Sequence, residues 1–153
     1  MISTTQLSDA IRAALSTVDD PEMPGVSIIE LGLLESLEVG LDGKVRIGLI
    51  PTFSGCPALT AIANDVRMVV ERIEAVSTVE VVFLTAPAWS VDRVTGAAEA
   101  QLRNGLGIAV ERTGQATCPR CGTVTSEQSM FGPTRCRAVH RCQGCGEVVE
   151  VMR

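Results

Sequence analysis

Two Cys-x-x-Cys pairs near the end of the chain constrain its fold more than any other feature. They read Cys118-Pro-Arg-Cys121-Gly and Cys142-Gln-Gly-Cys145-Gly, with 20 residues between them. Two such pairs at this distance are typical of a zinc ribbon, because each short loop brings two sulfurs to one ion and two loops complete a tetrahedron. Four protein ligands leave no open coordination position, so the spacing predicts a structural zinc site held by Cys118, Cys121, Cys142 and Cys145.

The same four cysteines also suit other chemistry. An iron–sulfur cluster takes four thiolates as well, whereas a disulfide framework would require a secreted chain. The N-terminus shows no basic start followed by an apolar stretch, so we expect no signal peptide and a cytoplasmic protein. Cys136 and His140 are spare ligands, and the sequence leaves open whether either contributes to the metal site.

Composition allows a further domain ahead of the ribbon. Apolar residues make up 46% of the 153 residues, which is enough for a core, but the only aromatic residues are one Trp and three Phe. The core must therefore consist of Val, Ile, Leu and Ala. No apolar run approaches the roughly 18–20 residues that span a bilayer, so no membrane partner is expected.

Charge is distributed unevenly along the chain. Residues 1–112 carry 8 basic and 15 acidic side chains, a formal charge of −7, whereas residues 113–153 carry 5 basic and 3 acidic side chains, a charge of +2. An acidic main domain repels phosphates, which disfavours nucleic acid as a partner. The sequence leaves open whether the chain forms a homo-oligomer.

Periodicity predicts an α+β domain before the ribbon. Ser3 with Gln6 three residues later is a capping box for a first helix. Asp42-Gly43 predicts a hairpin between two alternating strands over 33–39 and 45–49. A second helix is expected to begin at Pro57, because apolar residues then recur at helical spacing as far as Ile73.

Further elements follow the second helix. The sequence predicts a third strand over 79–84, a helix over 91–103 capped by Ser90 and stopped by Gly105, and a short strand over 108–110. Small polar residues over 113–117 predict a linker. We therefore expect an α+β domain over 1–112 and a zinc ribbon over 118–153.

Connection rules place the loops of this domain. A hairpin followed by a strand–helix–strand crossover gives a small mixed sheet of three to four strands, with helices packed on it. The loops 20–25, 51–56 and 85–90 should then converge at one sheet edge, where ligand sites tend to lie. Two prolines and a glycine predict that 20–25 is irregular.

Cys56 stands alone in the first 112 residues, immediately before the expected second helix. The positive end of the helix dipole favours the thiolate, which is the form that binds metal or attacks an electrophile. Asp20 and Glu22 in a neighbouring loop would supply further ligands or a base. The alternative is a half-buried cysteine that acts as a small hydrophobe.

These residues resemble a known family. Asp20-Pro-Glu-Met-Pro24, Pro51-Thr-Phe-Ser-Gly-Cys-Pro57 and Pro87-Ala-Trp-Ser90 are similar to the three motifs of the metal-sulfur cluster assembly domain of SufT-type proteins. The tail, with Ser129-Met-Phe-Gly-Pro-Thr-Arg-Cys136 between its cysteine pairs, resembles the C-terminal extension of PaaD-type accessory subunits of the phenylacetyl-CoA epoxidase system.

The resemblance implies a role in maturing iron-dependent enzymes. It implies that Cys56 is the functional thiol, with Asp20, Glu22 and Thr52 beside it, and that the cofactors are structural zinc and a transient iron or iron–sulfur cluster at Cys56. The client would be a subunit of phenylacetyl-CoA epoxidase or another iron-dependent protein. The chain would then be an accessory protein in aerobic phenylacetate degradation and not a stand-alone enzyme.

Three other classes of function stay open. A non-catalytic interaction subunit would bridge other subunits without using Cys56. A nucleic-acid-binding ribbon protein is disfavoured by the acidic charge and the few aromatic residues. A stand-alone thiol enzyme lacks an obvious base, because the only histidine, His140, lies in the ribbon.

Overall fold

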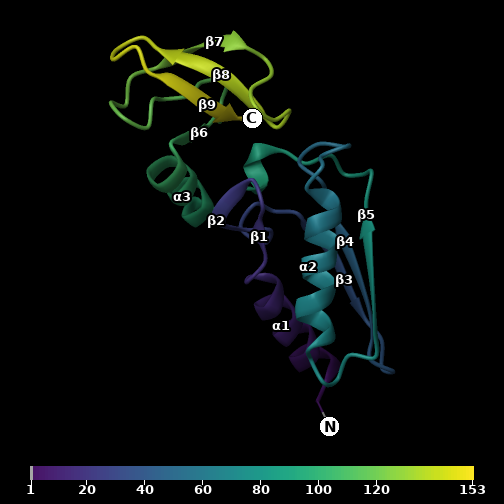
Figure 1. Cartoon of the computed structure of the whole chain (residues 1–153). Helices are drawn as coiled ribbons and strands as arrows, with labels where there is room; N and C mark the ends of the chain where they lie inside the picture. The colour runs from purple at the N-terminus through teal and green to yellow at the C-terminus, as the bar shows by residue number, and fades with distance from the viewer. Residues whose placement is uncertain (1) are drawn as a thin grey trace. The chain divides into compact units, whose positions relative to one another are not determined.

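A computed structural model describes residues 2–153 (Figure 1). The elements are α1 (Thr4–Leu15), β1 (Asp19–Asp20), β2 (Met23–Ser27), β3 (Leu34–Val39), β4 (Lys44–Leu49), α2 (Leu59–Glu71), β5 (Thr78–Phe83), the 3₁₀ helix η1 (Val91–Arg93), α3 (Gly96–Leu106), β6 (Ile108–Val110), β7 (Thr125–Ser129), β8 (Arg137–Cys142) and β9 (Val148–Met152). They form two compact units, of which the first ends at Trp89 and the second runs from Ser90 to Arg153. The predicted α+β class is confirmed.

The first unit is built on the mixed sheet β3-β4-β5. β3 pairs antiparallel with β4, and β5 pairs parallel with β4 after the α2 crossover, as predicted. Alternation along β4 buries Val45, Ile47 and Leu49, and α1 and α2 pack together along the sheet (Figure 1). The buried face is aliphatic, as the scarcity of aromatic residues required.

Local sequence signals set the ends of several elements. Ser3 caps α1 in the predicted box: its Oγ accepts the Gln6 N–H at 3.1 Å, and the Gln6 side chain accepts the Ser3 N–H at 3.0 Å. Gly43 turns the β3–β4 hairpin at φ +77°, and a Cβ there would lie 2.5 Å from the Ala75 carbonyl oxygen. Only glycine fits that position without displacing the backbone.

Two predictions around the sheet were wrong. The segment 20–25 is not irregular, because β1 and β2 form a short antiparallel pair that contains Pro24. A two-stranded pair leaves one side of each strand without ladder bonds, so it tolerates a residue that lacks an N–H. The strict alternation expected over 33–39 also fails, because a bulge between Leu34 and Ser36 shifts the register and leaves Glu35 exposed.

The predicted helix over 91–103 is divided and shifted. A single 3₁₀ turn, η1, is followed by extended Val94, and Thr95 then caps α3 by accepting the Ala98 N–H at 3.2 Å. The helix continues past Gly105 and ends at Gly107, which adopts φ +66°. The helix therefore stops where a left-handed residue closes it, and not at the first glycine in the sequence.

The second unit is larger than the expected ribbon of 118–153. Its sheet has the strand order β6-β9-β8-β7, so the predicted strand 108–110 pairs parallel with β9 in this unit. The expected linker 113–117 contains buried Ala116, whose carbonyl accepts the Thr125 N–H at 3.0 Å. The observed division at Trp89 thus differs from the expected boundary at 112, because α3 and β6 pack with the ribbon.

A helix that crosses a bilayer must be long and predominantly apolar. Among residues 2–153, none of the helices has the length and apolar character needed to cross a membrane.

Candidate metal centre and thiol loop

The four cysteines of the paired motifs converge at one point of the second unit. Their Sγ atoms all lie within 4.8 Å of one another, with Cys118 and Cys145 3.8 Å apart and Cys121 and Cys142 3.3 Å apart. A tetrahedral ion with four sulfurs at about 2.3 Å has edges of about 3.8 Å. A disulfide requires about 2.05 Å, and none of these four cysteines forms one. The donor set therefore fits one tetrahedral metal ion.

The two halves of this centre have the same backbone design. The Cys118 N–H donates to the Thr123 carbonyl at 2.8 Å, and the Gly122 N–H returns to the Cys118 carbonyl at 2.8 Å. The second half repeats this pattern with bonds from Cys142 N–H to Glu147 (2.8 Å) and from Gly146 N–H to Cys142 (3.1 Å). Gly122 and Gly146 both adopt φ +77°, which a side chain would oppose.

Hydrogen bonds to sulfur favour the thiolate form that a metal requires. Cys142 Sγ accepts the N–H groups of Gly144 (3.3 Å) and Cys145 (3.4 Å). The Thr123 hydroxyl lies 3.4 Å from Cys121 Sγ. Hydrogen bonds from the Thr123 side chain and backbone lower the pKa of Cys121 to about 6. This sulfur is thus prepared to bind a cation at neutral pH. At Cys145 a backbone hydrogen bond from Glu147 is outweighed by desolvation and by the neighbouring thiols, and the pKa rises to about 11.

Arg103 of α3 holds the first half of the centre from outside. Its guanidinium donates to the carbonyls of Thr117 (3.2 Å) and Cys118 (3.0 Å). These carbonyls flank a ligand sulfur, so the side chain fixes the direction from which the chain enters the site. Groups of this kind, one layer behind the ligands, tune metal affinity.

The two spare ligands lie apart from the centre. Among the described residues, the one group of His, Cys, Asp and Glu side chains placed to hold an ion consists of the four cysteines named above. Cys136 Sγ lies 3.1 Å from Thr134 Oγ1. His140 is buried, with its Nδ1 2.8 Å from Thr125 Oγ1 and its Nε2 3.9 Å from the Glu111 carboxylate.

Cys56 lies in the turn that leads into α2. Its N–H donates to the Phe53 carbonyl (3.3 Å), and its own carbonyl accepts the Leu59 N–H (3.2 Å), so the regular helix begins two residues later than Pro57. Gly55 before it adopts φ +96°, and the Cys56 side chain is half-buried. The thiol therefore stands at the start of the helix with part of its surface open to solvent.

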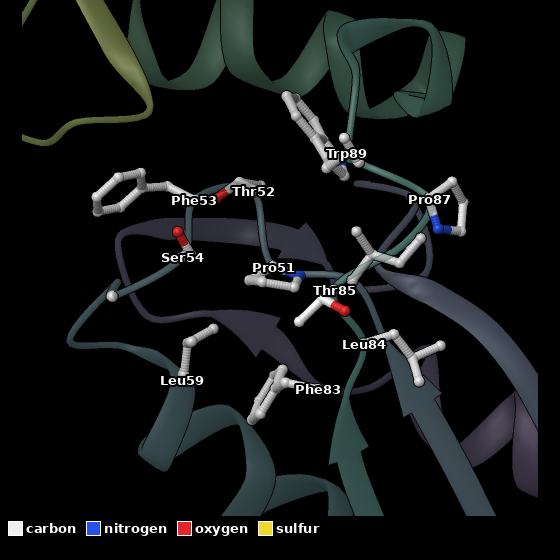
Figure 2. Close-up of a pocket in the computed structure, with 13 residues that line it drawn as sticks. Pro51, Thr52, Phe53, Ser54, Leu59, Phe83, Leu84, Thr85, Pro87 and Trp89 are labelled. Atoms are coloured by element: carbon white, nitrogen blue, oxygen red, sulfur yellow. The ribbon is translucent and has the colours of Figure 1, made fainter.

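A cavity of about 450 Å³ opens beside this turn (Figure 2). Its walls come from the segment after β4, the first residue of α2 and the segment after β5: Ile50, Pro51, Thr52, Phe53, Ser54, Gly55, Leu59, Phe83, Leu84, Thr85, Pro87, Ala88 and Trp89. Two of the three loops expected to converge thus do meet, at the carboxyl ends of the parallel strands β4 and β5. We call this cavity the aromatic pocket.

The third loop, residues 20–25, does not join this pocket and lines a different hollow. Asp20 is buried, its Oδ1 accepts the Glu22 N–H at 2.8 Å, and it lines a second hollow with Asp65 and Met68 from the middle of α2. This hollow shares no lining residue with the aromatic pocket, which contains Thr52. The roles of Cys56, Asp20, Glu22 and Thr52 therefore stay predictions.

Sequence reasoning missed two features of these sites. Phe53, Phe83 and Trp89 gather in one pocket, for which the only signal was the scarcity of aromatic residues in the chain. Arg103 is far from Cys118 in sequence, and no local pattern marks it. Both features arise where separate segments meet.

Comparison with known proteins defines the class. A family model of iron–sulfur cluster assembly proteins matches residues 8–81, and a model of the PaaD zinc beta ribbon domain matches residues 107–153. A solved structure from Bacillus anthracis, described as a domain of unknown function (DUF59), aligns with a TM-score of 0.61 at 30% identity, covering 65% of this chain and 93% of that one. The chain thus joins an iron–sulfur cluster assembly domain to a ribbon.

Similarity over nearly the whole chain specifies the family. A protein of Escherichia coli strain K12 that is named as one of the subunits of 1,2-phenylacetyl-CoA epoxidase is 36% identical, over 90% of this chain and 87% of its own length. The chain belongs to this family of PaaD-type proteins. An Fe-S protein maturation auxiliary factor of Porphyromonas gingivalis is 37% identical, over 63% of this chain and 91% of its own length.

Proposed function

We propose that this chain is an accessory protein of a phenylacetyl-CoA epoxidase and helps to install or maintain iron, as a di-iron or iron–sulfur centre, in a partner subunit. The observation that carries the proposal is the extent of the two similarities. The maturation factor matches 63% of the chain, whereas the epoxidase protein matches 90% of it and so includes the ribbon. The first unit would perform maturation, and the ribbon would direct it to one client.

In this proposal Cys56 is the transient ligand of the iron or cluster being delivered, and Asp20, Glu22 and Thr52 assist it. Its half-buried side chain at the start of α2 supports the assignment, because the helix dipole favours thiolate there. A cargo that is passed on needs a donor set that is easily exchanged. One thiolate with oxygen donors meets this need better than four thiolates do.

The ribbon holds zinc in this proposal, and its role is structural. Zinc is bound by four thiolates in closed sites, and such sites contribute folding energy. A [4Fe–4S] cluster places each thiolate on a different iron, and a [2Fe–2S] cluster divides the four thiolates between two irons, so either cluster spreads the sulfurs further apart than a single shared ion does. All four sulfurs lie within 4.8 Å of one another, with separations of 3.3 and 3.8 Å for two of the pairs, which favours the single ion.

The test compares Cys56→Ser with Cys136→Ser, another half-buried cysteine outside the metal centre. Each variant is co-expressed with the epoxidase subunits, and the iron content and epoxidation rate of the purified complex are measured. We expect Cys56→Ser to keep its fold and its zinc but to lower client iron several-fold, while Cys136→Ser matches the wild type. Normal iron content and epoxidation with Cys56→Ser would refute the proposed role of the thiol.

An interaction subunit without iron chemistry is the second candidate. The connection between β7 and β8 exposes two large apolar side chains, Met130 (57% exposed) and Phe131 (60% exposed), as a docking arm would. In this case Cys56→Ser would be silent, and Phe131→Ala would weaken assembly of the complex. The same co-expression experiment separates the two candidates.

A further inference from the structure

The aromatic residues of this chain are concentrated in one place. The sequence has four of them, one Trp and three Phe, and three of the four line the aromatic pocket. Among the described residues, the largest fully buried side chains are Ile, Leu and Met, with no aromatic residue. Aromatic side chains usually dominate cores, so their half-buried position at this pocket calls for a reason other than folding.

The tryptophan is held in a fixed position at the pocket wall. Trp89 Nε1–H donates to the Leu31 carbonyl at 2.7 Å, which satisfies the polar edge of the indole. Figure 2 shows Trp89, Phe53 and Phe83 placed on three sides of the pocket, with Thr85 between them. A fixed ring with its polar atom already bonded offers its remaining surface to an apolar or aromatic ligand.

The lining also defines the charge of the ligand. None of the 13 lining residues is charged, and the polar side chains are the hydroxyls of Thr52, Ser54 and Thr85. A phosphate or carboxylate would lose its hydration there without gaining a partner of opposite charge. A volume of about 450 Å³ falls in the range of roughly 300–1,000 Å³ typical of small-ligand sites. The pocket therefore suits one uncharged aromatic ring.

The aromatic pocket lies beside the turn that carries the Cys56 thiol. Gly55 and Leu59 both line it, and Cys56 lies between them in the chain. A ring seated in the pocket would place the group that carries it near the turn that bears the thiol. In the proposed function that group is the client polypeptide, because a client must come within bonding distance of Cys56 to receive iron.

We infer that the aromatic pocket binds an uncharged aromatic side chain of the client protein and docks the client backbone beside Cys56. This inference rests on the proposed function and adds the chemistry of client recognition to it. The occupant is a protein side chain. A free aromatic molecule is the competing outcome of the test.

Trp89 is the only tryptophan, so its fluorescence reports directly on the pocket. The full chain is titrated with Ac-Gly-Phe-Gly-NH2, Ac-Gly-Ala-Gly-NH2, Ac-Gly-Asp-Gly-NH2 and phenylacetamide, with excitation at 295 nm. We expect saturable binding of the Phe peptide, at least about tenfold tighter than that of the Ala and Asp peptides and tighter than that of phenylacetamide. Equal binding of the three peptides, or binding that does not saturate, would overturn the inference. Tighter binding of phenylacetamide than of the Phe peptide would show that the pocket binds a free aromatic molecule and not a protein side chain.

A pair of matched variants tests the location. Thr85→Arg places a long cation in the pocket from an exposed position, and Thr78→Arg makes the same change at an exposed position at the start of β5. We expect Thr85→Arg to weaken binding of the Phe peptide at least about tenfold and Thr78→Arg to leave it unchanged. If Thr85→Arg binds the peptide as the wild type does, the pocket is not the site.

A third variant separates this inference from the proposed function. Cys56→Ser should still bind the Phe peptide, because the thiol does not line the pocket, while it lowers the iron content of the client. If the Phe peptide binds but Cys56→Ser leaves the iron content of the client unchanged, the pocket is a binding site and the proposed role of Cys56 in iron delivery is refuted. If Cys56→Ser lowers client iron but the Phe peptide does not bind, only the inference about the pocket is refuted.

Discussion

Arg103 should control metal affinity although it is not a ligand. Its two hydrogen bonds join α3 to the carbonyls of Thr117 and Cys118, at 3.2 and 3.0 Å. In Arg103→Ala both carbonyls lose a charged donor, and the segment that carries the first ligand, Cys118, is no longer fixed. Because folding of a metal-stapled unit is coupled to metal binding, this loss should appear in the zinc dissociation constant.

The structure gives the magnitude. Hydrogen bonds from charged groups contribute about 1.5–3 kcal/mol each when buried, but the bond to Thr117 is exposed and contributes little. One partly buried bond then accounts for about 2 kcal/mol, which corresponds to about 30-fold weaker zinc binding. Arg103→Lys keeps a charged group that can donate to one of the carbonyls, so it should lose less than Arg103→Ala. It should still bind zinc more weakly than the wild type, because an ammonium does not bridge two carbonyls in the way that the planar guanidinium does.

Competition with a chromophoric chelator measures this effect in the full-length protein. Arg12→Ala is the matched control, since Arg12 is an exposed arginine near the end of a helix in the other unit. We expect Arg12→Ala to bind zinc as tightly as the wild type, Arg103→Lys to bind it more weakly, and Arg103→Ala to bind it most weakly. A zinc dissociation constant of Arg103→Ala within about threefold of the wild type would show that α3 does not support the centre.

Two further predictions concern the separate stability of the units. Removing zinc with a strong chelator should unfold the second unit, because its metal centre contributes folding energy, while the fluorescence of Trp89 in the first unit stays native. Circular dichroism and fluorescence melts measure the two effects, and simultaneous loss of the circular dichroism signal and of the native Trp89 fluorescence would contradict this prediction. Ser3→Ala removes the N-cap bond to the Gln6 N–H and should destabilise the first unit by about 1 kcal/mol in urea unfolding, with zinc content unchanged. An unchanged urea midpoint would show that the cap does not hold α1.

Features that depend on short stretches of sequence were predictable. The capping box at Ser3, the hairpin at Asp42-Gly43 and the apolar stripe of α2 each lie within one element, so local pattern determines them. The cysteine pairs belong to the same group, because each pair closes its own loop around Gly122 or Gly146. The sequence by itself thus determined the α+β class, the parallel crossover and the four sulfurs of the metal centre.

Features that depend on contacts between distant segments were decided by tertiary structure. Strand 108–110 pairs with β9, some forty residues away, and this pairing places α3 and Arg103 with the ribbon. The aromatic pocket forms only where the segments after β4 and β5 meet, and Asp20 lies in another hollow. Hydrophobic periodicity states which side of a strand or helix is buried, but it does not state against which segment, because aliphatic surfaces attract one another without direction.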